Sequence, residues 1–326
     1  MGKMDIRPRL DPQMAAALEV EARIAAETVA RHGLENADPK DLTAVRLQYN
    51  ANRAYWNTDA PIMDESQDLL LPGPYRDIPA RLHRPVQRGA EPAPVLIYLH
   101  GGGWIVGNLD THDRIMRILA QKSGCCVLGV DYHLAPEAKF PQPQDECCAA
   151  ADWILQHGAE YGLDPNRIAL AGDSAGANMS MTVLMHLKDQ GRIGAVGAAL
   201  LYYGSYGLRD SASRRLWGGA EDGLSAADLA FFRECLFEDQ AKMLDPRFDI
   251  LANDLTDLPP LFVLEVAMDP LADDSRALAD AVLEAGGQVD YRRAEGVLHG
   301  YLHMSHSVDA AMDALSDGAA FLRARM

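Results

Sequence analysis

One serine in the sequence stands in a pattern that makes it a candidate nucleophile. Residues 172–176 read Gly-Asp-Ser-Ala-Gly, directly after the apolar run 168–171 and before a stretch of small residues typical of a helix. Strand, sharp turn and helix form a nucleophile elbow, which exposes the serine Oγ at a helix N-terminus, where developing negative charge is favoured. Small flanking residues let strand and helix approach. We predict that Ser174 is catalytic, the alternative being a glycine-rich turn with a capping serine.

A serine hydroxyl needs a base to take its proton, and the base needs a carboxylate to orient it. His299 lies in a loop between the last expected strand and the last expected helix. Asp269 directly follows an apolar strand expected over residues 261–268, and open α/β sheets place their sites at such carboxyl ends. The chain order Ser174, Asp269, His299 is the one expected of this architecture, so we predict a catalytic triad of these residues.

Three other acids compete with Asp269 for the orienting role: Asp257, Asp273 and Asp274. Asp273 and Asp274 fit better in the first turn of the next helix, where the helix dipole favours acidic side chains. We therefore assign the triad acid to Asp269.

The histidines near the C-terminus allow a second interpretation. The spacing of His299, His303 and His306 could be that of metal ligands, but the glutamate of a His-Glu-x-x-His motif is missing and the segment begins in a loop. We expect no metal site here, and we expect His303 and His306 to be ordinary polar residues near the start of the last helix.

Three consecutive glycines lie upstream, within His-Gly-Gly-Gly-Trp at residues 100–104. Consecutive glycines lose much chain entropy on ordering, so they need a structural reason. Backbone N–H groups open to a reacting oxygen would supply one, and we predict an oxyanion hole made by the N–H groups of Gly102, Gly103 and Ala175. The alternative is a plain glycine-rich turn.

The segments around these residues alternate between strand and helix patterns. Short strands are expected over 68–72 and 78–84, and apolar strands over 95–100, 126–130, 168–171, 198–203, 261–268 and 289–293. Helices are expected over 112–123, 145–157, after Ser174, and over 274–285 and 308–325. Near-continuous apolar strands alternating with helices predict an α/β fold, with a mostly parallel sheet covered on both faces.

Two regions fall outside this alternation. An amphipathic helix is expected over 13–32 and a second helix over 42–56, and neither resembles a strand of a central sheet. Residues 205–256 also interrupt the alternation of strands and helices. We therefore expect residues 1–60 to form the N-terminal part of a helical cap and residues 205–256 an inserted second part of it. Residues 61–204 and 257–326 would form the catalytic core. Tyr49 and Trp56 in the cap and Trp104 beside the glycines could line a substrate pocket, with core packing as the alternative.

The composition limits the possible partners and compartments. The 326 residues carry a formal charge of −17, which argues against binding to nucleic acid or to anionic membranes. No apolar run reaches the roughly 18 residues of a membrane-spanning helix, and the N-terminus lacks the apolar core of a signal peptide. Four of the five cysteines form adjacent pairs in apolar segments, which suits reduced, buried residues of a cytoplasmic protein.

Four blocks, in this order, resemble those of the hormone-sensitive-lipase-like (bacterial family IV) carboxylesterases of the α/β-hydrolase fold: His100-Gly-Gly-Gly-Trp104, Asp131-Tyr-His-Leu-Ala-Pro-Glu137, Gly172-Asp-Ser-Ala-Gly176 and Asp269-Pro-Leu-Ala-Asp273. His299-Gly-Tyr301 completes the set. The resemblance implies an eight-stranded, mostly parallel sheet flanked by helices, with a helical cap. It implies cofactor-free hydrolysis of short- to medium-chain carboxylic esters, a small-molecule ester as partner, and a homodimer formed through the last strand and helix.

The chain departs from the family pattern at three positions. His133 and Ala272 stand where relatives have arginine, and Met268 replaces an aromatic residue. These departures weaken inferences about salt bridges and loop stability but leave the triad intact. Two other functions stay open. Formamidases and lactonases share the glycine block, so an amidohydrolase or lactonase (for example arylformamidase-like) is one alternative. A small-molecule binding module is the other, although all three triad residues are present.

Overall fold

The computed structural model describes residues 2–87, 92–220 and 222–326, and within them eight strands form a single sheet. The strands are β1 (Met63–Leu71), β2 (Ile78–Pro85), β3 (Ala93–Leu99), β4 (Cys126–Val130), β5 (Leu163–Asp173), β6 (Val196–Tyr202), β7 (Leu261–Val266) and β8 (Val289–Ala294). Their order is β1-β2-β4-β3-β5-β6-β7-β8, and only the β1–β2 and β2–β4 pairs of these strands are antiparallel. The predicted mostly parallel, eight-stranded α/β sheet is confirmed.

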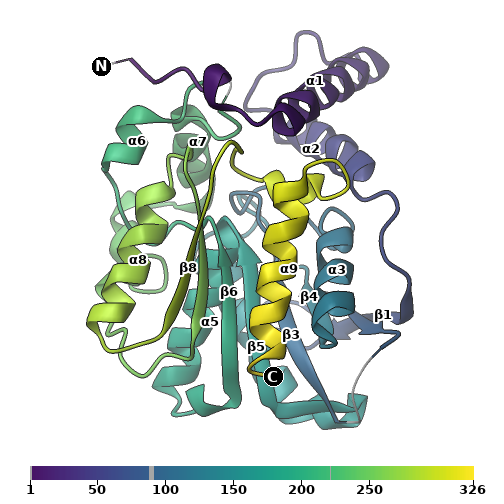
Figure 1. Ribbon diagram of the computed structural model, residues 1–326, viewed down its shortest axis with the longest axis vertical. Helices are drawn as coiled ribbons and strands as arrows, with labels where there is room; N and C mark the ends of the chain where they lie inside the picture. The colour runs from purple at the N-terminus through teal and green to yellow at the C-terminus, as the bar shows by residue number, and fades with distance from the viewer. Residues whose placement is uncertain (1, 88–91, 221) are drawn as a thin grey trace.

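Helices cover both faces of the sheet because side chains of a buried parallel strand point alternately to either side. Leu96 and Tyr98 of β3 pack with α3 (Asp113–Ser123) and α9 (Asp309–Arg323). Ile97 and Leu99 pack into the cluster on the opposite face. The helices there are α4 (Gln142–His157), α5 (Ala175–Asp189) and α8 (Ala272–Glu284). Figure 1 shows α9 and α3 on the near side of the sheet.

The remaining helices gather at the upper end of the sheet in Figure 1, where the chain passes from β8 towards α9. They are α1 (Pro12–His32), α2 (Leu42–Trp56), α6 (Ala212–Leu216) and α7 (Ala226–Leu236). The two sets touch, because Lys40, just before α2, forms a 2.6 Å ion pair with Glu234 of α7. The carboxyl ends of the central strands therefore lie beneath helices that come from two separate parts of the chain.

Some element boundaries differ from the sequence prediction. β7 ends at Val266, so Asp269 stands three residues beyond the strand rather than directly after it. α4 begins at Gln142, three residues earlier than expected, because prolines are tolerated in the first turn of a helix. Within residues 205–256, the segment Gln240–Leu244 is a 3-10 turn rather than an α-helix. None of the helices in the described residues combines the length and apolar character that a membrane span requires.

Candidate active site

The structure brings the three predicted triad residues together. Ser174 stands between β5 and α5, His299 in the loop after β8, and Asp269 after β7. His299 Nε2 lies 2.8 Å from Ser174 Oγ, and His299 Nδ1 lies 2.5 Å from Asp269 Oδ2. When the carboxylate accepts the Nδ1 proton, Nε2 is left as an acceptor for the serine hydroxyl. This arrangement can draw the proton from Ser174.

The acid of this group is held rigidly, whereas its competitors point elsewhere. Asp269 is fully buried, and its second oxygen, Oδ1, accepts the backbone N–H of Leu271 at 2.8 Å. Asp273 and Asp274 lie in the first turn of α8, as predicted. Asp273 Oδ2 accepts the N–H of Ser213 at 2.7 Å, and Asp274 Oδ1 accepts the N–H of Tyr206 at 2.8 Å. Both therefore fasten the 205–256 segment to the core.

The turn that carries Ser174 has the strain expected of a nucleophile elbow. Its φ is 53°, in the left-handed region that non-glycine residues rarely adopt. A Cβ at Gly176 would overlap the carbonyl oxygen of Leu99, and a Cβ at Gly172 would overlap the backbone of Gly176. Only glycine at both positions lets β5, α5 and β3 approach this closely, and this approach holds the serine at the tip of the turn.

The glycine loop beside Ser174 is equally constrained. Gly102, Gly103 and Trp104 all have positive φ, at 118°, 58° and 64°. In the described part of the chain, no group accepts a hydrogen bond from the N–H of Gly102, Gly103 or Ala175. Three unpaired donors beside a nucleophile can bind a developing oxyanion.

A buried carboxylate joins the glycine loop to the serine turn. Asp173 Oδ1 accepts the N–H of Gly101 at 2.9 Å and the hydroxyl of Tyr98 at 2.8 Å, and it lies 3.4 Å from His112 Nε2. Burial tends to raise the pKa of Asp173, but His112 and the hydrogen bond from the Tyr98 hydroxyl hold it well below its usual range. The carboxylate is therefore ionised at neutral pH and fixes both loops.

His303 belongs to this buried cluster, so its interpretation as an ordinary polar residue near a helix start is wrong. It is 3% exposed, and its ring lies 4.5 Å from that of His112. Burial, with the charge of Arg53 nearby, lowers its pKa well below the usual value, so the ring is neutral. Its apolar neighbours in Tyr-Leu-His-Met, residues 301–304, were the signal in the sequence that could have indicated burial.

The structure separates the three histidines that had metal-ligand spacing in the sequence. Both nitrogens of His299 are engaged by Ser174 and Asp269, and His306 stacks on Trp56 at 5.0 Å. A different trio in the described residues, His112, Asp173 and His303, has potential ligand atoms within 4.8 Å of one another. Its aspartate already accepts two hydrogen bonds within the protein, as described above.

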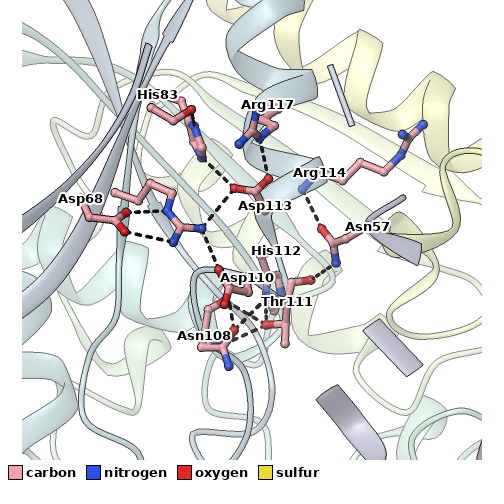
Figure 2. Close-up of polar contacts among 12 residues, drawn as sticks. Asn57, Asp68, His83, Asn108, Asp110, Thr111, His112, Asp113, Arg114 and Arg117 are labelled. Atoms are coloured by element: carbon pink, nitrogen blue, oxygen red, sulfur yellow. Dashed lines mark hydrogen bonds and ion pairs between the residues drawn. The ribbon is translucent and has the colours of Figure 1, made fainter. Parts of the chain in front are cut away.

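The loop that carries His112 also fixes the end of α2, as Figure 2 shows. Asn57, directly after α2, donates through Nδ2 to the carbonyl of Thr111 at 2.8 Å and accepts the N–H of Arg114 at 2.7 Å. Thr111 Oγ1 lies 2.9 Å from His112 Nδ1. Because one loop serves both contacts, α2 is held in place relative to the buried Asp173 cluster.

Two cavities meet at Ser174. The smaller one, of about 40 Å³, has a mostly apolar wall that includes Trp104, Leu208, Leu224, Phe232, Phe248 and Leu271. The larger one, of about 640 Å³, is lined by His299 and by polar residues of α1 and α2: Glu21, Gln48, Tyr49, Asn52 and Arg53. Trp104 and Tyr49 each line one of these cavities, whereas Trp56 is buried in the core and lines neither. The sequence prediction missed Glu21 and Arg53.

Comparisons with known proteins agree with this geometry. A family model described as alpha/beta hydrolase fold matches residues 96–303. An acetyl esterase of Salmonella schwarzengrund is 44% identical over 288 residues, covering 88% of each chain. The esterase of Pyrobaculum calidifontis superposes with a TM-score of 0.87 at 30% identity, covering 97% of this chain and 98% of that one. An ester hydrolase from the Lake Arreo metagenome superposes with a TM-score of 0.87 at 33% identity, again covering 97% of this chain and 98% of that one.

Proposed function

This chain belongs to the alpha/beta hydrolase fold family whose model it matches and is a serine carboxylesterase, and from that premise we propose that Ser174, His299 and Asp269 perform the hydrolysis. The observation that carries the proposal is the continuous relay from Asp269 through His299 to Ser174, with contacts of 2.5 and 2.8 Å. In this arrangement the imidazole can take the serine proton while the aspartate orients the imidazole and stabilises its cation.

The chemistry proceeds through an acyl-enzyme. Ser174 Oγ attacks the ester carbonyl while His299 Nε2 takes the hydroxyl proton, and the N–H groups of Gly102, Gly103 and Ala175 bind the oxyanion. His299 then gives its proton to the leaving alkoxide, and the alcohol departs. A water molecule loses a proton to His299 and attacks the acyl-enzyme, and the imidazolium then returns that proton to Ser174 Oγ as the acid departs. Asp269 holds the imidazole in the required tautomer throughout.

The two cavities divide the substrate between them. The imidazolium must reach the leaving oxygen, so the alcohol lies on the side of His299 and the acyl group on the other side. The wall of the small cavity contains Gly103 and Ala175 but not His299. Its volume of about 40 Å³ holds about three water-sized groups at roughly 10–15 Å³ each. We therefore propose that the enzyme prefers short acyl groups, acetyl above all, which the acetyl esterase relatives support.

Rates on a matched set of esters test this proposal. Hydrolysis of p-nitrophenyl acetate, butyrate and octanoate should fall with chain length, because an eight-carbon chain cannot enter the small cavity. N-formylkynurenine and a simple lactone, offered in parallel, should be poor substrates. Faster turnover of the octanoate than of the acetate would contradict the assignment of the acyl side, and faster turnover of the formamide or lactone would contradict ester hydrolysis.

Three further features are proposals of the same kind. The helices of residues 1–60 and 205–256 form a two-part cap, which the Lys40–Glu234 ion pair supports. The protein is a homodimer that associates through β8 and α9, which the edge position of β8 in the sheet supports. It resides in the cytoplasm, which the burial of its five cysteines, with no disulfide among the described residues, supports. Light scattering on purified protein tests the dimer directly, since a monomeric mass at micromolar concentration would contradict it.

A further inference from the structure

The large cavity on the His299 side has a polar wall built around Arg53. The Arg53 side chain is 14% exposed, and its Nη1 lies 3.4 Å from Glu21 Oε1 and 3.1 Å from Asn52 Oδ1. The guanidinium adjoins the catalytic loop, because a Cβ built at Gly300 would lie 3.7 Å from Arg53 Nη2. Arg53 therefore stands beside the residue that follows His299, where the leaving alcohol must lie.

The donors of Arg53 are incompletely used. Its Nε is buried and has no hydrogen-bond partner in the described part of the chain. A guanidinium carries five N–H donors, and a buried donor without an acceptor is destabilising. The stacking of Arg53 on the Tyr49 ring, at 4.7 Å, supports the cation from one side but supplies no acceptor at Nε. No hydrogen bond from Arg53 Nη2 occurs among the described residues, and this nitrogen faces Gly300, which lines the cavity. A ligand with acceptor oxygens would complete the donor set at Nη2, whereas the buried Nε is out of its reach.

Acceptors stand next to these donors. Glu21 Oε1 accepts from Trp56 Nε1 at 3.3 Å and faces Arg53, while no hydrogen bond to Glu21 Oε2 occurs among the described residues. The amides of Gln48 and Asn52 line the same cavity. A hydroxyl both donates and accepts, so a molecule with several hydroxyls can satisfy carboxylate, guanidinium and amides together.

The charge of this cavity disfavours an anionic ligand. The positive charge of Arg53 is balanced by Glu21, and the ionised Asp173 and the exposed Asp228 also line the cavity. His303 contributes no charge because it is neutral. An apolar ligand would leave Arg53 Nη2 and Glu21 Oε2 without partners, at a cost in binding. A cavity of about 640 Å³ is large enough to enclose a ring-sized group.

We propose that the alcohol released by this enzyme is a neutral polyhydroxylated one, a polyol or a sugar, which Arg53 and Glu21 recognise by hydrogen bonds. The inference rests on the proposed esterase function and on the placement of the leaving group beside His299. Arg53 and Glu21 are then specificity-determining residues that contact the substrate.

Comparing two acetates of matched shape distinguishes recognition of the alcohol's hydroxyls from a fit of its ring to the cavity. Methyl 6-O-acetyl-glucopyranoside and cyclohexylmethyl acetate share a ring, a methylene and an acetyl group, but only the first carries ring hydroxyls. We expect the enzyme to show a kcat/KM for the sugar acetate that is roughly tenfold to hundredfold higher, as one or two hydrogen bonds to charged groups would give. Acetoxyacetate supplies an anionic alcohol and should be the poorest of the three.

Variants then assign the preference to residues. Arg53→Met and the isosteric Glu21→Gln should each lower kcat/KM for the sugar acetate at least about tenfold more than for cyclohexylmethyl acetate. Arg23→Met is the matched control, since Arg23 lies on the same helix as Glu21 with a side chain 60% exposed, and it should leave both rates unchanged. If Arg53→Met fails to fold, the comparison of the two acetates can still be made with Glu21→Gln.

The outcomes separate this inference from the proposed function. Equal or faster hydrolysis of cyclohexylmethyl acetate by the native enzyme, or a preference for acetoxyacetate, would overturn polyol recognition while leaving ester hydrolysis intact. If Arg53→Met and Glu21→Gln lowered kcat/KM equally for both ring acetates, these residues would only support the His299 loop. That result would also overturn polyol recognition. Failure to hydrolyse p-nitrophenyl acetate at all would instead refute the proposed function.

Discussion

The backbone N–H of Gly101 donates a hydrogen bond to the carboxylate of Asp173 at 2.9 Å. Gly101 precedes the two glycines of the proposed oxyanion hole, and Asp173 precedes the nucleophile. A Cβ at Gly101 would overlap this carboxylate, so the contact is as close as the backbone allows. One buried anion thus fixes the turn of Ser174 relative to the glycine loop, and with it the distance between the proposed nucleophile and the proposed oxyanion hole.

Replacing this anion should slow the chemistry rather than weaken binding. In Asp173→Asn the side-chain oxygen can still accept from Gly101, but the charge that faces His112 is lost. We expect kcat to fall about tenfold to hundredfold, with KM within about threefold, because small displacements at a reacting centre cost this much. Steady-state kinetics on p-nitrophenyl acetate measure the effect, with the exposed Asp280→Asn as control. An unchanged kcat in folded Asp173→Asn would refute the positioning role.

The role of Asp269 predicts a much larger loss. In Asp269→Asn the amide would favour the wrong tautomer of His299, so kcat should fall by roughly 10³–10⁴ while the protein stays folded. Asp257→Asn is the control, because Asp257 is an exposed competitor in the sequence whose φ of 55° asparagine tolerates. A loss of less than about tenfold in Asp269→Asn would assign the orienting carboxylate elsewhere.

The elbow glycines should be needed for stability as well as for activity. Gly176→Ala would push a methyl group into the Leu99 carbonyl, so we expect the free energy of unfolding to fall by about 3 kcal/mol or more. Gly194→Ala places its methyl group in open space and should change stability by less than about 0.5 kcal/mol. Urea unfolding of the two variants gives the comparison. Similar stability of both would mean that strand β3 and helix α5 are not packed as described.

Much of the catalytic apparatus could be predicted from the sequence because it depends on local patterns. The residue types from Gly172 to Gly176 predict the sharp turn that they form. The parallel order of the strands brings Ser174, Asp269 and His299 to one edge of the sheet, whatever the details of packing. The apolar neighbours of His303 could have indicated its burial, but its contact with His112 depends on how the turn after β8 packs against α3, which no local pattern encodes. The position of Arg53 beside the proposed site likewise depends on tertiary structure, because it results from the packing of α2 over the loop after His299.

Asp131 should make stability depend on pH. Burial raises the pKa of its carboxyl to about 6, despite the opposing charge of Arg76. The folded state therefore holds this proton more tightly than the unfolded chain, and its contribution to stability is lost as pH rises from about 4 through 6.

Asparagine cannot ionise, so Asp131→Asn should be more stable than the native protein at pH 7, by about 2–3 kcal/mol, and the difference should vanish towards pH 4. Urea unfolding at several pH values between 4 and 7 measures it. A variant that is less stable than the native protein at pH 7 would show that the attraction between Asp131 and Arg76 outweighs the cost of burial.

If Ser174 forms the acyl-enzyme, as proposed, turnover depends on the hydroxyl of this residue. Ser174→Ala should lower p-nitrophenyl acetate turnover by about 10⁵-fold or more, whereas Ser316→Ala on α9 should retain full activity. A fluorophosphonate should label the native protein at Ser174 and leave Ser174→Ala unlabelled, as mass spectrometry of the peptides would show. Substantial turnover by folded Ser174→Ala, or labelling at another residue, would contradict the mechanism.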